Sequence, residues 1–173
     1  MILNDQITNF IKMYQLAETD FCDLTVTQLK ESTDWKIEEG VETCYLYNSE
    51  VERLITESLK DIIQNYIDSG CWPWFTGFHA YTSVRFQRFQ KNKKMDIRCD
   101  HNRFINNSNY GMPILTIIGL LNDDFTNGNF MMIGEKLKFA KGQLLIFPSN
   151  FLYPHAIEKV TEGTRYQFIS WVY

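Results

Sequence analysis

The sequence predicts an α+β protein in which helices precede a strand-rich sandwich or barrel. Apolar residues recur at helical spacing in the first part of the chain, whereas the second part consists of short apolar runs broken by Pro, Gly and Asn. The chain has 173 residues, 45% of them hydrophobic, which suffices for one well-buried core. We therefore predict a single domain over residues 1–173, helical over about 1–70 and strand-rich over about 71–173.

Helices are predicted in three segments of the first part. Helical spacing is found over residues 7–14 and over residues 51–66. The second of these helices is expected to bury one face, formed by Val51, Leu54, Ile55, Ile62 and Tyr66. Ser49 fits the first position of a capping box, and Gly70 fits the helix end. Residues 21–29 are predicted as a further helix, and all three are expected to support a sheet.

Strands are predicted from six apolar runs in the second part, at residues 82–89, 113–121, 130–133, 136–140, 143–147 and 164–173. Residues 98–100 are also expected to be extended, so that positions 98 and 100 point toward the same side. In the last strand the same alternation places Arg165 and Gln167 on one face, together with Ile169 and Trp171.

Composition excludes several classes of protein. The net charge of -4 and the 15% aromatic content argue against a disordered chain and against a nucleic-acid partner. No run of 18 apolar residues and no signal-peptide pattern is found, so we expect a cytoplasmic protein without membrane partners. The four cysteines are widely spaced and are expected to be reduced and mostly buried: Cys22, Cys44, Cys71 and Cys99.

The C-terminal part resembles a known family. Residues 142–171 are similar to the end of the prolyl 4-hydroxylase-like branch of the Fe(II)/2-oxoglutarate-dependent dioxygenase superfamily. In that branch an Arg or Lys about ten residues after the last His binds the distal carboxylate of 2-oxoglutarate. Arg165 stands at that distance from His155. A guanidinium also suits this role because it meets a carboxylate with two parallel hydrogen bonds.

The resemblance covers about residues 80–173. Residues 114–125, ILTIIGLLNDDF, match a strand of the family that ends in Leu-Asn and an acidic turn. Phe89, Asn92 and Met95 lie at the positions of a Tyr-x-x-Gly-x-x-Met segment before the metal motif. In length and layout the chain is most similar to short, single-domain versions carried by bacteriophages, which would place it in the host cytoplasm.

This resemblance implies a double-stranded β-helix (jelly-roll) fold and a hydroxylase that acts on a peptidyl, prolyl or other substrate and releases succinate and CO2. The implied cofactors are Fe(II), 2-oxoglutarate and ascorbate, and the implied partner is a protein or peptide substrate. Asp100 and His155 would bind the metal, Arg165 would bind 2-oxoglutarate, and Thr116 would contribute a weaker co-substrate contact. An ordinary strand position is the alternative for Thr116.

Three positions depart from the family pattern. Phe89 replaces a tyrosine, residues 127–129 replace Gly-Gly-Glu, and Arg98 stands where the first histidine ligand is expected. A guanidinium stays protonated and has no lone pair for a metal. The alternative function is therefore a non-catalytic binding or regulatory protein in which an Arg98–Asp100 ion pair replaces the metal. Catalysis would survive if His101 reached the metal through a β-bulge, or if His79 or water completed the ligand set.

Two further features have alternative interpretations. Between residues 85 and 103 seven basic residues face two acidic ones, and such a cluster attracts anionic substrates or simply solvates a turn. Aromatic residues gather at Trp72, Trp74, Phe75 and Phe78, where they would form either a wall of a substrate groove or part of the core.

Overall fold

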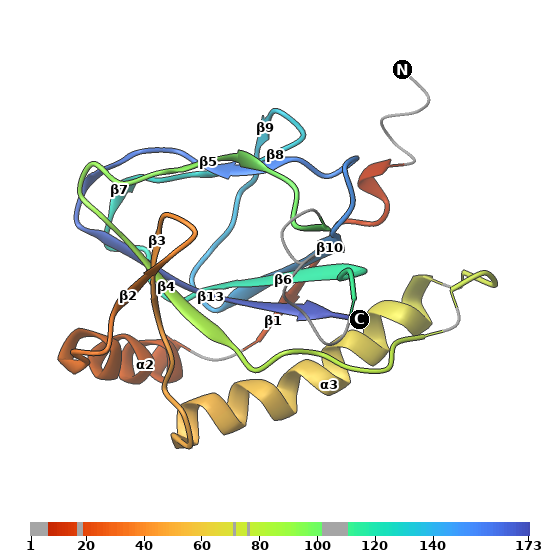
Figure 1. The fold of residues 1–173 in the computed structure, drawn as a ribbon, viewed down its shortest axis with the longest axis horizontal. Helices are drawn as coiled ribbons and strands as arrows, with labels where there is room; N and C mark the ends of the chain where they lie inside the picture. The colour runs from red at the N-terminus through yellow and green to blue at the C-terminus, as the bar shows by residue number, and fades with distance from the viewer. Residues whose placement is uncertain (1–6, 17–18, 71, 76, 102–110) are drawn as a thin grey trace.

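The computed structural model describes residues 7–16, 19–70, 72–75, 77–101 and 111–173. In this part of the chain two sheets face each other, and two helices cover the outer face of the larger sheet (Figure 1). All strand pairs are antiparallel. The predicted α+β class with a jelly-roll core is confirmed.

The larger sheet has seven strands in the order β1 (Lys12–Gln15), β10 (Gln143–Pro148), β6 (Leu115–Leu120), β13 (Thr164–Val172), β4 (Arg85–Gln90), β3 (Val41–Cys44) and β2 (Lys36–Glu38). The smaller sheet has four, in the order β5 (Met95–Arg98), β11 (His155–Ile157), β8 (Phe130–Met132) and β9 (Glu135–Lys136). A two-stranded ribbon consists of β12 (Val160–Glu162) and β7 (Thr126–Asn127).

The core has two compartments on opposite faces of the larger sheet. The first lies under the helices α2 (Thr19–Glu31) and α3 (Glu50–Gly70) and includes Phe86 and Phe168. The second lies between the two sheets and includes Phe130 and Trp171. No helix among the described residues is both long and apolar enough to cross a membrane.

Successive side chains of strand β13 point alternately into these two compartments. Tyr166 and Phe168 belong to the helix side, whereas Ile169 and Trp171 belong to the space between the sheets. Arg165 lies on this second side as well, with its guanidinium over the ring of Phe125. The predicted face of the last strand is therefore confirmed, and it places polar residues in the interior where a jelly roll holds its site.

Helix α3 begins where the sequence predicts. The Ser49 hydroxyl accepts a hydrogen bond from the backbone N–H of Glu52 at 3.1 Å, and the helix ends at Gly70. The buried face differs from the prediction, because it consists of Val51, Ile55, Leu59, Ile63 and Tyr66. Leu54 is 36% exposed. The predicted face includes positions 54 and 62, whereas the buried side chains follow steps of four from Val51 to Ile63 and a step of three to Tyr66.

We expect Ser49→Ala to lower the free energy of unfolding by about 1 kcal/mol, because the first turn of α3 loses its capping acceptor. Urea denaturation followed by circular dichroism measures the change. Ser58→Ala is the control, because its exposed hydroxyl bonds a carbonyl within the same helix and its loss should leave stability almost unchanged. Equal effects of the two substitutions would contradict the capping role.

Three sequence predictions in the scaffold are wrong. Residues 7–14 are helical only at Ile7 and Thr8, because Lys12–Gln15 form strand β1, which pairs along β10 at the sheet edge. The run at 136–140 contributes only Lys136 to a strand, and residues 137–140 line a cavity. The first 70 residues also contain the hairpin β2–β3, which pairs with β4. These segments are so short that tertiary pairing decides their structure.

Candidate functional site

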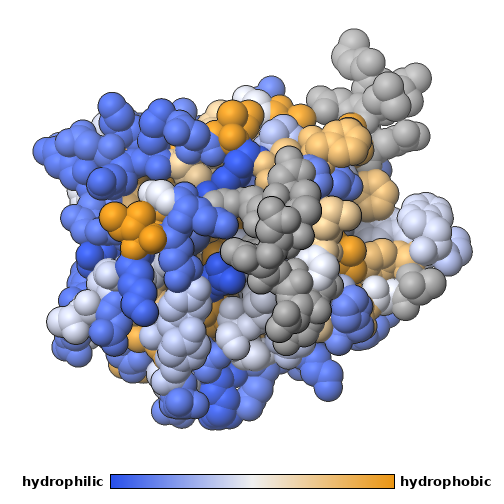
Figure 2. Space-filling view, in the orientation of Figure 1, coloured by the Kyte–Doolittle hydropathy of each residue, from blue (hydrophilic) through white to orange (hydrophobic). Residues whose placement is uncertain are grey.

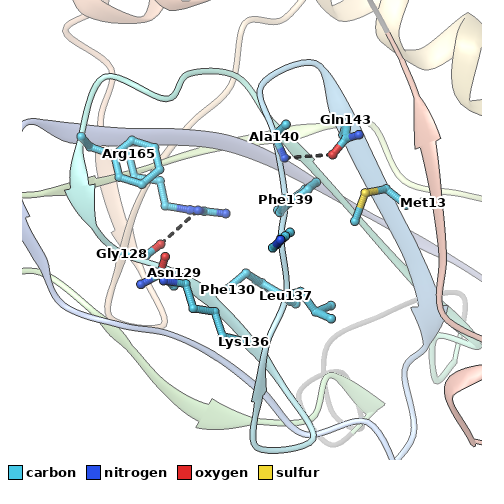
Figure 3. Close-up of a pocket in the computed structure, with 12 residues that line it drawn as sticks. Met13, Gly128, Asn129, Phe130, Lys136, Leu137, Phe139, Ala140, Gln143 and Arg165 are labelled. Carbon is cyan, nitrogen blue, oxygen red and sulfur yellow. Dashed lines mark hydrogen bonds between the residues drawn. The ribbon is translucent and has the colours of Figure 1, made fainter. Parts of the chain in front are cut away.

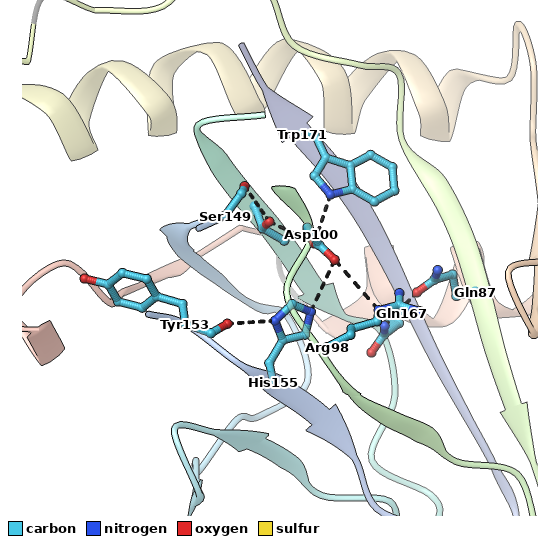
Figure 4. A network of polar contacts seen from close by, with 9 residues as sticks. Gln87, Arg98, Asp100, Ser149, Tyr153, His155, Gln167 and Trp171 are labelled. Carbon is cyan, nitrogen blue, oxygen red and sulfur yellow. Dashed lines mark hydrogen bonds and ion pairs between the residues drawn. The ribbon is translucent and has the colours of Figure 1, made fainter. Parts of the chain in front are cut away.

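Asp100 lies two residues after the end of β5, between the two sheets, and is completely buried (Figure 4). Its Oδ2 atom accepts hydrogen bonds from the Thr116 hydroxyl on β6 and from the Trp171 indole N–H on β13, both at 2.9 Å. Because Thr116 gives its only hydrogen to Asp100, the Ser149 hydroxyl at 2.8 Å must be the donor toward Thr116. Thr116 was predicted as a co-substrate contact, and in the structure its hydroxyl is committed to Asp100.

His155 begins β11 and points its Nε2 atom at the free oxygen of Asp100, Oδ1, at 3.5 Å. Its Nδ1 atom lies 3.2 Å from the carbonyl oxygen of Tyr153. A carbonyl only accepts, so Nδ1 carries the hydrogen and the neutral ring has its lone pair on Nε2. The rings of Phe130 and Phe147 lie 5.8 and 5.1 Å from the imidazole and hold its orientation.

Arg98 lies opposite His155 in the β5–β11 pair. Its Nε atom is 3.7 Å from Oδ1 of Asp100, which makes an ion pair without a hydrogen bond. Three buried polar atoms without a hydrogen-bond partner therefore converge at one point: Arg98 Nε, Asp100 Oδ1 and His155 Nε2. The structure thus brings together the two predicted metal ligands and the arginine that departs from the pattern.

Electrostatics keep Asp100 ionised despite its burial. Burial raises the pKa of Asp100, but the hydrogen bond and charge that a protonated His155 ring would supply, together with Arg98 and the Trp171 hydrogen bond, outweigh it and lower the pKa to about 2. Burial also lowers the pKa of Arg98, an effect that the charge of Asp100 opposes. At neutral pH the centre therefore holds one carboxylate and one guanidinium.

The donor atoms fit iron only in part. Asp100 Oδ1 and His155 Nε2 are a carboxylate oxygen and an imidazole nitrogen with free lone pairs, as non-heme iron requires. Within the described residues, however, no group of three or more His, Cys, Asp or Glu side chains could hold a metal ion. Arg98 stands at the position where the sequence resemblance predicts a third ligand, and a guanidinium has no lone pair to offer.

The substitute ligands considered from the sequence lie elsewhere. Strand β5 does have a bulge, since its residues 95 and 98 pair with residues 157 and 155 of β11. The bulge does not bring in His101, whose ring packs 6.3 Å from Phe151 in a separate cavity. His79 is exposed, and its backbone N–H pairs with the carbonyl of Tyr173.

Arg165 is the second buried cation of this interior and is 2% exposed. Its Nε donates to Oε1 of Gln167 at 3.1 Å, and its Nη1 donates to the carbonyl of Gly128 at 3.0 Å. The rings of Phe125 and Phe139 lie 5.5 and 5.8 Å from the guanidinium carbon. Burial lowers the pKa of Arg165 to about 9, so the group remains a cation at neutral pH.

The remaining nitrogen of Arg165, Nη2, has no hydrogen-bond partner. The residue lines a cavity of about 540 Å³ (Figure 3). Lys136, Lys138 and Gln143 line the same cavity, so its polar groups are mainly hydrogen-bond donors and cations. Among the described residues no acidic side chain pairs with Arg165. A buried cation with a free donor in such a cavity is a site for an anion.

The aromatic residues singled out from the sequence divide between core and cavity. Trp72, Trp74 and Phe75 line a second cavity of about 550 Å³ together with His101 and Phe151. Phe78 packs against the helix-side core instead. Figure 2 shows a mainly hydrophilic face whose apolar side chains gather toward the right, above the end of α3.

The basic cluster is largely neutralised by neighbouring acids. Arg85 pairs with Glu38, Arg88 with Glu42 and Lys94 with Asp96, and Arg98 pairs with Asp100. Lys91 and Lys93 are exposed beside the turn that follows β4. Arg103 lies outside the described residues, as does Cys71. The other three cysteines are free, with Cys22 and Cys44 buried and Cys99 half-buried.

Several site residues were not assigned a role from the sequence. The sequence places Trp171 on the correct face but does not indicate that its indole donates to Asp100, and it gives Ser149 no role in the site. Tyr153 contacts His155, and Gly128 contacts Arg165, through backbone carbonyls. Such contacts cannot be predicted from the residue type. Gln87 is not part of the family motif that the sequence shows, yet its Oε1 accepts a hydrogen bond from Nε2 of Gln167 at 2.8 Å.

We expect Trp171→Phe to lower the free energy of unfolding by about 1.5 to 3 kcal/mol, since a hydrogen bond to a buried carboxylate is lost. The matched control is Trp35→Phe, whose indole N–H donates to the neutral carbonyl of Leu29 and should cost about 1 kcal/mol. Chemical denaturation at neutral pH measures both. A smaller loss for Trp171→Phe than for the control would contradict the role assigned to the indole.

A jelly roll with an Asp and a His facing each other between its sheets, and a buried Arg in the same interior, matches the arrangement that the sequence resemblance implies for a 2-oxoglutarate-dependent oxygenase. The chain belongs to the 2OG-Fe(II) oxygenase superfamily, whose family model matches residues 84–173. A comparison by sequence with curated proteins finds no match.

Comparison with solved structures gives the same fold. A Pseudomonas putida prolyl-4-hydroxylase is 14% identical with a TM-score of 0.75, covering 99% of this chain and 96% of that one. The viral collagen prolyl hydroxylase from Paramecium Bursaria Chlorella virus-1, in complex with 2OG, is 13% identical with a TM-score of 0.73, covering 94% of each chain. A Trichoplax adhaerens prolyl hydroxylase, in complex with a hypoxia inducible factor peptide fragment, is 16% identical with a TM-score of 0.72, covering 100% and 87%. The fold is therefore that of the prolyl hydroxylases.

Proposed function

We propose that this chain is a hydroxylase that uses 2-oxoglutarate, with the distal carboxylate of this co-substrate on Arg165 and with Asp100 and His155 as its metal ligands. One observation carries the proposal: a fully buried guanidinium has only neutral partners among the described residues and keeps one nitrogen free beside a cavity. A carboxylate in that cavity would supply the missing charge and accept from Nη2.

The overall reaction consumes one 2-oxoglutarate, one O2 and one C–H bond, and yields succinate, CO2 and a C–OH group. One oxygen atom enters succinate and the other enters the substrate. Iron, when bound, supplies the oxidising chemistry. The chain's own residues orient the groups: Thr116 and Trp171 hold one oxygen of Asp100, and the Tyr153 carbonyl keeps the lone pair of His155 on Nε2.

A peptidyl substrate, with proline as the first residue to test, follows from the similarity to prolyl hydroxylases. Arg98 lines a cavity of about 470 Å³ between the β2–β3 turn and β5. Because Arg98 also pairs with Asp100, we position the substrate in this cavity.

A second candidate function is a 2-oxo-acid-binding protein without catalysis. It is favoured by the ion pair between Arg98 and Asp100. In this pair the guanidinium supplies the positive charge that a metal would otherwise supply beside Asp100, and it repels a divalent ion. In this candidate Arg165 binds the same ligand, and the ligand serves a structural or regulatory purpose.

Two measurements on the wild-type protein distinguish these functions. Succinate release from 2-oxoglutarate in the presence of Fe(II) and O2 supports the hydroxylase, because uncoupled turnover needs no known substrate. Equilibrium iron binding that is stoichiometric and lost in Asp100→Ala supports it as well. Absence of succinate together with iron binding no stronger than in Asp100→Ala would establish the non-catalytic candidate.

A further inference from the structure

Gln167 holds the guanidinium of Arg165 in its orientation, two positions along the same face of β13. The side chain of Gln167 is completely buried, and its Oε1 accepts the Nε–H of Arg165 at 3.1 Å. We infer that Gln167 is a positioning residue for the 2-oxo acid: together with Gln87 it turns the free Nη2 of Arg165 toward the cavity and leaves the arginine charge available to the ligand.

The chain of donors and acceptors has only one consistent direction. The Nε of Arg165 is a donor, so Gln167 must present its oxygen there. The amide nitrogen of Gln167 then faces Gln87, which must in turn present its own oxygen, as the 2.8 Å contact between Nε2 and Oε1 shows. Arg165 therefore determines which end of the Gln167 amide it meets, and Gln167 in turn determines the orientation of the Gln87 amide on β4.

The acceptor for Arg165, Oε1 of Gln167, is uncharged, and this absence of charge matters for ligand binding. A carboxylate at position 167 would accept the same hydrogen bond but would also neutralise Arg165. The buried ligand site would then contain an internal anion that competes with the ligand's carboxylate. An amide satisfies Nε and the carbonyl of Gly128 satisfies Nη1, so one orientation is fixed while the charge stays uncompensated.

This inference rests on the proposed co-substrate site at Arg165, and its test separates the two. Calorimetry measures binding of 2-oxoglutarate and of 2-oxovalerate, which has the same chain length but lacks the distal carboxylate. Both titrations are made on wild type, Gln167→Glu and Gln167→Met. Gln143→Glu is the matched control, because it adds a charge to the same cavity while its Oε1 contact is to the backbone N–H of Ala140.

We expect wild type to prefer 2-oxoglutarate over 2-oxovalerate. Gln167→Met should weaken 2-oxoglutarate binding roughly tenfold and Gln167→Glu roughly 100-fold, with the preference abolished in the latter. The melting temperatures should follow a different order, with Gln167→Glu at least as stable as wild type and Gln167→Met less stable. A residue with a structural role alone would make affinity follow stability.

Each other outcome has a definite meaning. Equal binding of 2-oxoglutarate by wild type and Gln167→Glu overturns the positioning role. So does a parallel loss of affinity and stability across the variants, or an equally large effect of Gln143→Glu. If wild type itself shows no preference for 2-oxoglutarate, the proposed function fails, and with it the ligand that Gln167 would serve.

Discussion

Arg98→His is expected to increase the affinity for Fe(II) on the order of 100-fold or more and to raise succinate release from 2-oxoglutarate. The substitution places an imidazole opposite His155 in the β5–β11 pair and two residues from Asp100, where the third ligand of the centre is missing. It also removes a cation. A guanidinium about 5 Å from a divalent ion costs about 7 kcal/mol at an effective dielectric constant near 20.

The two contributions are separated by Arg98→Gln, which removes the charge but provides no imidazole. Iron affinity is measured by competition with a chelator of known strength, under anaerobic conditions. The ligand interpretation requires Arg98→His to exceed Arg98→Gln clearly. Equal gains would mean that the charge alone excludes iron, and no gain in either variant would show that position 98 is not part of a metal centre.

The sequence singles out residues of the candidate site more readily than it predicts the scaffold, and the reason is physical. Asp100, His155 and Arg165 are singled out by the resemblance to a family whose motif places side chains at definite spacings, and the structure brings Asp100 and His155 together. The helix α3 is also predictable, since its 21 residues repeat one pattern many times. Strands β2 and β3 have three and four residues, and their structure depends on pairing with β4, which lies far along the chain.

The interactions that orient the site could not be predicted for a different reason. The imidazole of His155 and the guanidinium of Arg165 are each fixed by a backbone carbonyl, from Tyr153 and from Gly128. Every residue carries such a carbonyl, so no residue type announces it. The position of Arg98 was recognisable as a departure, but its 3.7 Å separation from Asp100 required the structure.

That separation also bears on the meaning of Arg98. A guanidinium that fully replaced the metal would bind the carboxylate through two short hydrogen bonds. Instead Nε remains without a hydrogen-bond partner beside Oδ1 of Asp100 and Nε2 of His155. Leaving Asp100 Oδ1 and His155 Nε2 without partners costs stability, and a metal ion would satisfy these two acceptors, although it would not satisfy the donor Nε of Arg98. For this reason the hydroxylase remains our first proposal.

Arg165→Lys is expected to weaken 2-oxoglutarate binding by roughly 10- to 100-fold, since it keeps the charge but loses the planar fork. Lysine has one nitrogen, and the carbonyl of Gly128 and Oε1 of Gln167 would both compete for its hydrogens. The ligand's carboxylate would then receive fewer and less directed hydrogen bonds. Calorimetry measures the affinity, and 2-oxovalerate binding, which does not use Arg165, should change little.

Arg88→Lys is the control for this substitution. Arg88 also carries its guanidinium over an aromatic ring, that of Trp35, and pairs with Glu42 on the outer side of the sheet. It has no contact with the cavity beside Arg165, so its replacement should leave the affinity for 2-oxoglutarate unchanged. If Arg165→Lys binds as tightly as wild type, the fork geometry is irrelevant and the site recognises charge alone. If both substitutions weaken binding equally, the loss comes from a general disturbance of the fold, because both keep the charge, and Arg165 is not the residue that contacts the ligand.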